Sequence, residues 1–146
     1  MENLEADSFT VSEDNKSISD FSITPFINSE SPLAIVLVID TSGSMVQSLE
    51  NSISAAKEFI KTLESNDQVA LIAFKEQPVI VQELTTDRGL LTQALDELTA
   101  IGDSALFDSL VEAVGMLKSR TERKIVVVIT DGYETGISSF TFEQVV

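Results

Sequence analysis

Apolar and polar residues between positions 32 and 146 follow two periods in turn, one typical of strands and one typical of helices. Continuous apolar runs rich in β-branched residues predict buried strands, and apolar positions spaced by three and four predict amphipathic helices. The predicted strands are 33–39, 68–74, 79–83 and 124–130, and the predicted helices are 46–64, 87–99 and 105–118, with another helix starting at 140. Strands that alternate with helices predict an α/β domain.

The connections between these segments predict how the sheet is built. Strands 68–74 and 79–83 are joined by a segment too short for the crossover that parallel strands need, so this pair is antiparallel. The expected fold is a doubly wound, mostly parallel, Rossmann-like sheet with one antiparallel edge strand. Ligands of such sheets bind at the carboxyl ends of the strands, where the strand order reverses. If strands 33–39 and 124–130 are neighbours, that crevice lies just beyond their ends.

Oxygen-bearing side chains follow strand 33–39 at a spacing that an extended segment brings to one side. Asp40, Ser42 and Ser44 are separated by one residue each, so their side chains can converge on one point. Carboxylate and hydroxyl oxygens suit Mg²⁺, Mn²⁺ or Ca²⁺ rather than zinc or copper. The segment therefore predicts a site for a hard divalent cation.

Two later segments supply further carboxylate and hydroxyl side chains. Strand 124–130 ends in Asp131-Gly132, and Ser104 lies in the sequence Gly-Asp-Ser-Ala-Leu-Phe-Asp of residues 102–108, where a helix begins. In this order the three segments resemble the von Willebrand factor A domain family. Its signature is D-x-S-x-S, then a threonine in a G-x-T-x-L-x-D context, then a final Asp-Gly after a hydrophobic strand. Ser104 stands where the family usually has threonine, and the resemblance covers residues 32–146.

The resemblance implies a metal-ion-dependent adhesion site. In the family the hydroxyls bind the ion directly and the aspartates act largely through bound water. This assigns Ser42, Ser44 and Ser104 as direct ligands, and Asp40 and Asp131 as residues that orient water. Neutral ligands leave most of the charge of a Mg²⁺ ion uncompensated, so an open coordination position attracts a carboxylate from a partner protein. The implied function is metal-dependent protein binding without catalysis, with Mn²⁺ or Ca²⁺ as alternative ions.

Three other interpretations of the same residues are open. Each serine taken alone is also a common helix N-cap, and Asp131-Gly132 is a common turn pair. A Mg²⁺-dependent phosphatase of the haloacid dehalogenase type also places an aspartate after its first strand. Such an enzyme needs a second aspartate where Ser42 stands. The third interpretation is a scaffold with a vestigial metal site.

Composition narrows the classes of function. The chain has no cysteine and no histidine, which excludes thiol nucleophiles, thiolate or histidine metal sites and a Ser-His-Asp triad. A net charge of -15 argues against nucleic acid and anionic lipid as partners. No apolar run has the length of a membrane span, and residues 1–12 do not have the pattern of a signal peptide. These features leave the compartment open.

The sequence also leads to one structural prediction for residues 1–31 and another for the C-terminal end of the domain. Residues 1–31 predict an acidic leader with a small hairpin that turns at Asn15, similar to the tail of a preceding β-rich region in a bacterial subgroup of the family. The family fold has six strands and residues 32–146 supply four, so we expect the domain to be truncated after its fourth strand. Strand 124–130 then has an unpaired edge, which favours self-association.

Overall fold

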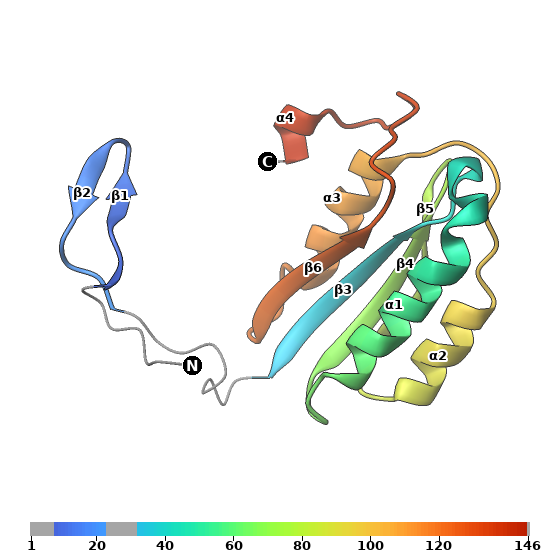
Figure 1. The fold of residues 1–146 in the computed structure, drawn as a ribbon, viewed down its shortest axis with the longest axis horizontal. Coiled ribbons are helices and arrows are strands. Elements are labelled where there is room, and N and C mark those ends of the chain that lie inside the picture. Colours follow the sequence, from blue (N-terminus) through green and yellow to red (C-terminus); the bar gives the residue numbers. More distant parts are fainter. Residues whose placement is uncertain (1–7, 23–31, 146) are drawn as a thin grey trace. The chain divides into compact units, whose positions relative to one another are not determined.

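The computed structural model describes residues 8–22 and 32–145 (Figure 1). Backbone contacts divide the chain into two units, residues 1–30 and 31–146. In the first unit, strands β1 (Val11–Glu13) and β2 (Lys16–Ile18) pair antiparallel. Asp14 and Asn15 have φ values of 49° and 62°, as a two-residue hairpin turn requires. A hairpin is present where the sequence predicts one, while residues 1–7 and 23–31 of the acidic leader lie outside the described residues.

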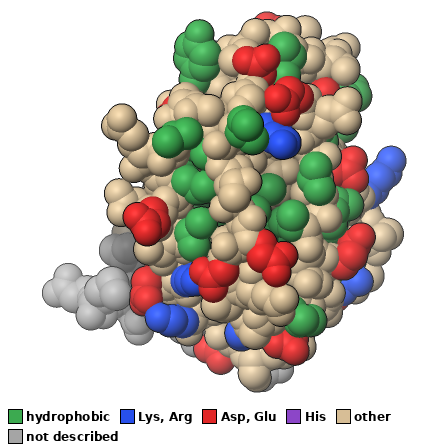
Figure 2. Space-filling model, turned by 90° about the vertical axis from the view of Figure 1, so that its right-hand side faces the viewer, with side chains coloured by type: hydrophobic (Ala, Val, Ile, Leu, Met, Phe, Trp, Pro, Cys, Tyr) green, Lys and Arg blue, Asp and Glu red, His purple; other side chains and the backbone are tan. Residues whose placement is uncertain are grey.

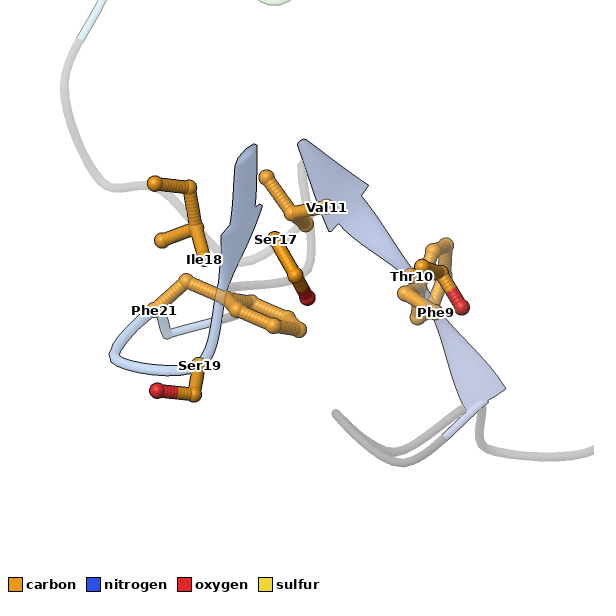
Figure 3. Close-up of a pocket in the computed structure, with 7 residues that line it drawn as sticks. All are labelled: Phe9, Thr10, Val11, Ser17, Ile18, Ser19 and Phe21. Atoms are coloured by element: carbon orange, nitrogen blue, oxygen red, sulfur yellow. The ribbon is translucent and has the colours of Figure 1, made fainter. Parts of the chain in front are cut away.

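The hairpin leaves its apolar side chains only partly covered. Phe9 and Val11 are exposed, and together with Ile18 and Phe21 they line a pocket of about 370 Å³ (Figure 3). A two-stranded ribbon of this size buries too little apolar surface to be stable in water by itself.

The second unit is built on a four-stranded sheet with the order β5-β4-β3-β6. Its strands are β3 (Leu33–Asp40), β4 (Gln68–Phe74), β5 (Pro78–Thr85) and β6 (Arg123–Ile129). Strand β3 pairs parallel with both β4 and β6, and β5 pairs antiparallel with β4. The predicted α/β sheet, mostly parallel with one antiparallel edge strand, is confirmed. Because β3 and β6 are parallel neighbours, their carboxyl ends lie side by side, as the sequence predicts.

Helices connect these strands in the described part of the second unit. They are the 3₁₀ helix η3 (Gly43–Gln47) and the α-helices α1 (Leu49–Lys61), α2 (Arg88–Asp96), α3 (Leu106–Leu117) and α4 (Phe142–Val145). The helix predicted over 46–64 is shorter than expected, because the chain after β3 first makes a 3₁₀ turn. There the Gly43 N–H donates to Gly102 O, and the Met45 N–H donates to Ser42 O. These bonds hold the motif loop outside the α-helix.

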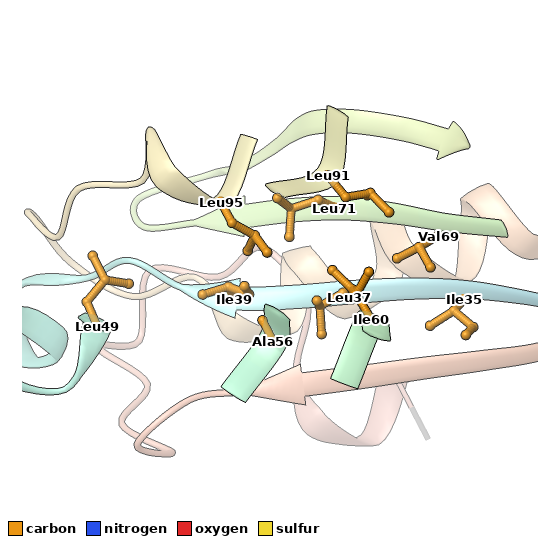
Figure 4. Close-up of a cluster of buried hydrophobic side chains, with 10 residues drawn as sticks. All are labelled: Ile35, Leu37, Ile39, Leu49, Ala56, Ile60, Val69, Leu71, Leu91 and Leu95. Carbon is orange, nitrogen blue, oxygen red and sulfur yellow. The ribbon is translucent and has the colours of Figure 1, made fainter. Parts of the chain in front are cut away.

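The core lies on both faces of the sheet. Alternate β3 residues point to opposite sides: Ile35, Leu37 and Ile39 pack with residues of α1 and α2 (Figure 4). Ala34, Val36 and Val38 pack with residues of α3 on the other face. A strand covered on both faces is expected to be apolar throughout, as β3 is. The first polar residue of β3, Asp40, is therefore delivered to the end of a fully buried strand.

The surface of the molecule is acidic and locally apolar. Figure 2 shows Asp and Glu side chains spread among apolar side chains over one face.

Among the helices that the structure describes, none has the length and apolar character of a membrane span.

Candidate metal centre

The carboxyl end of β3 brings the first three candidate ligands together. Asp40 is fully buried and Ser42 is 2% exposed, while Ser44 lies at the surface. The Ser42 N–H donates to Asp40 Oδ1 at 2.9 Å, and the hydroxyls of Ser42 and Ser44 lie 3.1 Å apart. The Ser42 and Ser44 hydroxyls therefore lie side by side, and the Asp40 carboxylate lies against the Ser42 backbone.

The end of β6 adds Asp131 to this group. Thr130 Oγ1 donates to Asp40 Oδ2 at 2.7 Å, which joins the two strand ends. The pKa of Asp131 is lowered, first by the Tyr133 N–H that donates to its carboxylate and then by a hydrogen bond from the Ser44 side chain. Asp131 is therefore ionised at neutral pH. The Thr130 hydroxyl and the Ser44 side chain thus connect the end of β6 to the residues at the end of β3.

Ser104 reaches the same end of the sheet on a separate loop. The Ile101 N–H donates to Thr41 O at 2.8 Å, and Gly102 O accepts from the Gly43 N–H at 2.8 Å. Gly102 has a φ of +86°, and a Cβ at this position would lie 2.0 Å from Glu76 Oε1, so only glycine fits there. These contacts fix the loop that carries Ser104 against the loop that carries Ser42.

The Ser104 hydroxyl differs from the others in having no partner. Ser104 is fully buried, and its Oγ makes no hydrogen bond to any described residue. The structure thus brings the Ser104 loop to the site but does not bond its hydroxyl to the other four candidates. An unpartnered buried hydroxyl is costly unless a ligand satisfies it.

Two threonines that the sequence motifs do not include also belong to the site. Thr130 bonds Asp40, as described, and Thr135 bonds the backbone of Ser104. Thr135 Oγ1 accepts from the Ser104 N–H at 3.1 Å and donates to Ser104 O at 3.1 Å, while the Thr135 N–H donates to the same oxygen at 3.3 Å. The position of Thr130 directly before Asp131 was an available signal, whereas nothing in the sequence marks Thr135.

The helix-cap interpretation of the serines fails for two of them. Ser42 occupies the N-cap position of η3, but its side chain makes no capping hydrogen bond. The N-cap of α3 is Ala105, and the Ser104 hydroxyl bonds nothing in the described residues. The turn interpretation of Asp131 holds, because Asp131 Oδ1 accepts from the Tyr133 N–H at 3.0 Å.

The donor set fits a hard divalent cation bound mainly through hydroxyls. The described residues contain no group of three or more His, Cys, Asp or Glu arranged to hold a metal, so a carboxylate cage is absent from them. The ion pairs in the same residues join Lys57 to Asp96, Lys61 to Glu58 and Arg120 to Glu122. The buried Asp40 carboxylate thus has hydrogen bonds from neutral donors and no ion pair among the described residues. A buried carboxylate of this kind is stabilised by a cation.

Comparison with known proteins identifies the family. Residues 35–134 match the family model of the von Willebrand factor type A domain. The chain belongs to this family. The resemblance read from the three motif segments is confirmed, and von Willebrand factor A domains serve as protein-interaction modules.

Two curated relatives of this A domain are longer proteins. An uncharacterized protein of Borreliella burgdorferi is 35% identical over an alignment of 108 residues that covers 67% of this chain and 32% of that protein. An uncharacterized protein of Synechocystis sp. is 34% identical over an alignment of 106 residues that covers 69% of this chain and 25% of that protein. The chain thus spans about a third and a quarter of the length of these relatives.

Solved structures share the A-domain fold. The von Willebrand factor type A protein of Catenulispora acidiphila is 26% identical with a TM-score of 0.69, over 79% of this chain and 29% of that one. The vWF domain of the type V pili tip protein Mfa5 of Porphyromonas gingivalis is 25% identical with a TM-score of 0.66, over 71% of this chain and 39% of that one. The PilB minor pilin of Streptococcus sanguinis, at 20% identity, has a TM-score of 0.63 over 76% of this chain and 32% of that one. This last likeness shows the fold alone.

Proposed function

We propose that this A domain is a protein-binding module that engages a partner carboxylate through a Mg²⁺ ion. Asp40, Ser42, Ser44, Ser104 and Asp131 would hold the ion. The observation that carries the proposal is the fully buried Ser104 hydroxyl, which has no hydrogen-bond partner among the described residues. Leaving such a group unsatisfied costs about 1–3 kcal/mol, and a bound cation removes that cost.

The five candidates divide by chemistry. The hydroxyls of Ser42, Ser44 and Ser104 act as neutral ligands, and the carboxylates of Asp40 and Asp131 hold water or bind directly. Asp40 is kept in place by the Ser42 N–H and the Thr130 hydroxyl. Such a site supplies an electrophilic metal position that favours a carboxylate from outside. Mn²⁺ or Ca²⁺ would fit the same oxygen donors.

The relatives support a partner that is another protein. The A domain of Mfa5 belongs to a type V pili tip protein. By analogy, the partner of this domain is a protein in a surface or pilus-type assembly that presents an Asp or Glu carboxylate. No observation favours the phosphatase alternative, because residue 42 is a serine bonded to Ser44 and supplies no second carboxylate beside Asp40.

Metal binding tests the proposal through Ser104. We expect isothermal titration with Mg²⁺ to show one site in the intact chain and at least tenfold weaker binding by the Ser104→Ala variant. Ser109→Ala is the matched control, since Ser109 is another fully buried serine near the start of α3 whose hydroxyl donates to Leu106 O at 2.6 Å. We expect this control to keep its Mg²⁺ affinity, while its free energy of unfolding falls by about 1 kcal/mol.

Stability without metal separates the two variants further. Ser104→Ala removes an unsatisfied hydroxyl, so its apo form should melt at the same or a higher temperature than the unmodified chain. Mg²⁺ should then raise the melting temperature of the unmodified chain and of Ser109→Ala, but not that of Ser104→Ala. Equal Mg²⁺ binding by the unmodified chain and Ser104→Ala, or no binding by either, would refute the proposed site.

A further inference from the structure

Each of the three loops that carry candidate ligands also carries one strongly exposed apolar side chain. Val46 is 64% exposed, Tyr133 63% and Ile101 61%, which makes them the most exposed large hydrophobic side chains among the described residues. Val46 lies two residues after Ser44, Tyr133 two after Asp131, and Ile101 three before Ser104. We call Val46, Ile101 and Tyr133 the apolar rim.

Backbone hydrogen bonds tie the rim to the candidate metal centre. The Ile101 N–H donates to Thr41 O, in the loop between Asp40 and Ser42. The Tyr133 N–H donates to the Asp131 carboxylate itself. Val46 lies in η3, which begins at the glycine bonded to Gly102. Figure 1 shows the loops after β3 and β6 and the loop before α3 meeting at one end of the sheet.

Carboxylates lie beside the rim as well. The Glu76 side chain rests against Gly102, the residue after Ile101. Asp103 follows and is exposed. The chain as a whole carries a charge of -15. These groups repel an acidic partner surface. Only for a carboxylate that reaches the metal position does attraction to the ion exceed this repulsion.

The combination of a polar centre, an apolar rim and flanking carboxylates selects one kind of partner. We propose that the site binds a protein segment with a single acidic residue flanked by apolar side chains. The acidic residue occupies the metal position, and its apolar neighbours cover Val46, Ile101 and Tyr133. Apolar contacts around a desolvated polar centre are a common source of binding energy at protein interfaces. This inference rests on the proposed Mg²⁺ site and specifies its ligand.

Short peptides with a central Asp test this specificity on the intact chain saturated with Mg²⁺. The probe is acetyl-Gly-Phe-Asp-Leu-Gly-amide, compared by NMR titration with peptides that carry Ser-Asp-Ser, Glu-Asp-Glu or Phe-Asn-Leu at the same three positions. We expect the Phe-Asp-Leu peptide to bind about tenfold or more tightly than the Ser-Asp-Ser peptide, because it buries apolar surface on the rim. The Glu-Asp-Glu peptide should bind more weakly than Ser-Asp-Ser, and Phe-Asn-Leu should not compete.

Rim variants show where the preference arises. Val46→Ser, Ile101→Ser and Tyr133→Ser should each reduce the preference for Phe-Asp-Leu over Ser-Asp-Ser, and the triple variant should abolish it. The matched control is Val114→Ser on α3, whose side chain is 57% exposed and lies away from the three loops; it should keep the full preference. Mg²⁺ affinity is measured for every variant by calorimetry, which separates a change in peptide recognition from a change in the metal site.

The outcomes distinguish this inference from the proposed function. If the unmodified chain binds Mg²⁺ but binds the Phe-Asp-Leu and Ser-Asp-Ser peptides equally, the rim inference is overturned and the metal site stands. The same holds if the triple rim variant keeps the preference. If the unmodified chain does not bind Mg²⁺, the proposed function is overturned and the rim inference with it.

Discussion

In the sequence, Thr135 lies close to Asp131 and far from the other candidate ligands. Its hydroxyl nevertheless bonds both the N–H and the carbonyl oxygen of Ser104. The bonds span 31 residues and hold the backbone of Ser104, whose own hydroxyl has no partner among the described residues. Residues that orient a metal ligand commonly affect metal affinity nearly as much as the ligand does. Thr135 is therefore a positioning residue for the proposed site.

Replacing Thr135 with valine keeps the shape of the side chain and removes the hydroxyl. We expect Thr135→Val to weaken Mg²⁺ binding by about tenfold, because the Ser104 peptide loses two hydrogen bonds and its hydroxyl is held less firmly. Calorimetry measures the affinity. Thr135→Ser, which retains the hydroxyl, should restore most of it. Unchanged affinity in Thr135→Val would show that the rest of the loop holds Ser104 without help.

At the scale of elements, α3 is capped by a distant segment. Its N-cap residue, Ala105, has no side-chain acceptor, and Glu134 Oε2 instead accepts from the Leu106 N–H at 2.7 Å. Ser138 Oγ accepts from the Phe107 N–H at 3.2 Å in the same way. The segment after β6 thus satisfies amide groups that a helix start leaves unpaired. It links α3 to β6, the strand that precedes Asp131.

Removing this cap should weaken the fold without touching a candidate ligand. We expect Glu134→Ala to lower the free energy of unfolding by about 1 kcal/mol, the usual cost of losing a side-chain cap. Urea denaturation followed by circular dichroism measures the change. Glu112→Ala is the control, because Glu112 is an exposed glutamate of α3 whose side chain makes no hydrogen bond to the described residues. Equal stability of the two variants would mean that water caps α3 as well as Glu134 does.

At the scale of the whole molecule, the sheet of the A domain has two outer edges among the described residues. Strand β5 forms one edge and β6 the other. Strand β6 is rich in apolar residues, and Val128 within it is 37% exposed. Open apolar edges are sites where strands of other molecules pair.

We predict that the 146-residue chain self-associates through an open sheet edge. The charge of -15 opposes association, but salt screens that repulsion beyond about 8 Å at about 0.15 M ionic strength. Light scattering should therefore report a larger mean mass as salt is raised from about 0.01 M to about 0.15 M. A monodisperse monomer with cooperative melting at the higher salt would show that the four described strands suffice.

The sequence by itself determined the order and type of nearly all the elements and named the five candidate ligands of the centre. Strand 68–74 was predicted with its observed bounds, and the other strands within two residues at each end. This succeeds because burial on one or two faces imposes a period that the sequence must repeat. Asp40, Ser42, Ser44 and Asp131 could be named as candidates from the sequence, since they stand at the ends of strands that lie side by side. Their role as metal ligands stays a prediction.

Only the tertiary structure decided how those residues are held. The 3₁₀ turn before α1 exists because Gly43 bonds Gly102, and the helical period alone placed the helix start too early. Thr130 reaches Asp40 across 90 residues of sequence, and the Ser104 hydroxyl is left without a partner among the described residues where the loop before α3 packs against the loop after β3. Helical and strand periods are local properties of the backbone. A hydrogen bond between distant residues depends on how the finished elements pack, and no local pattern records it.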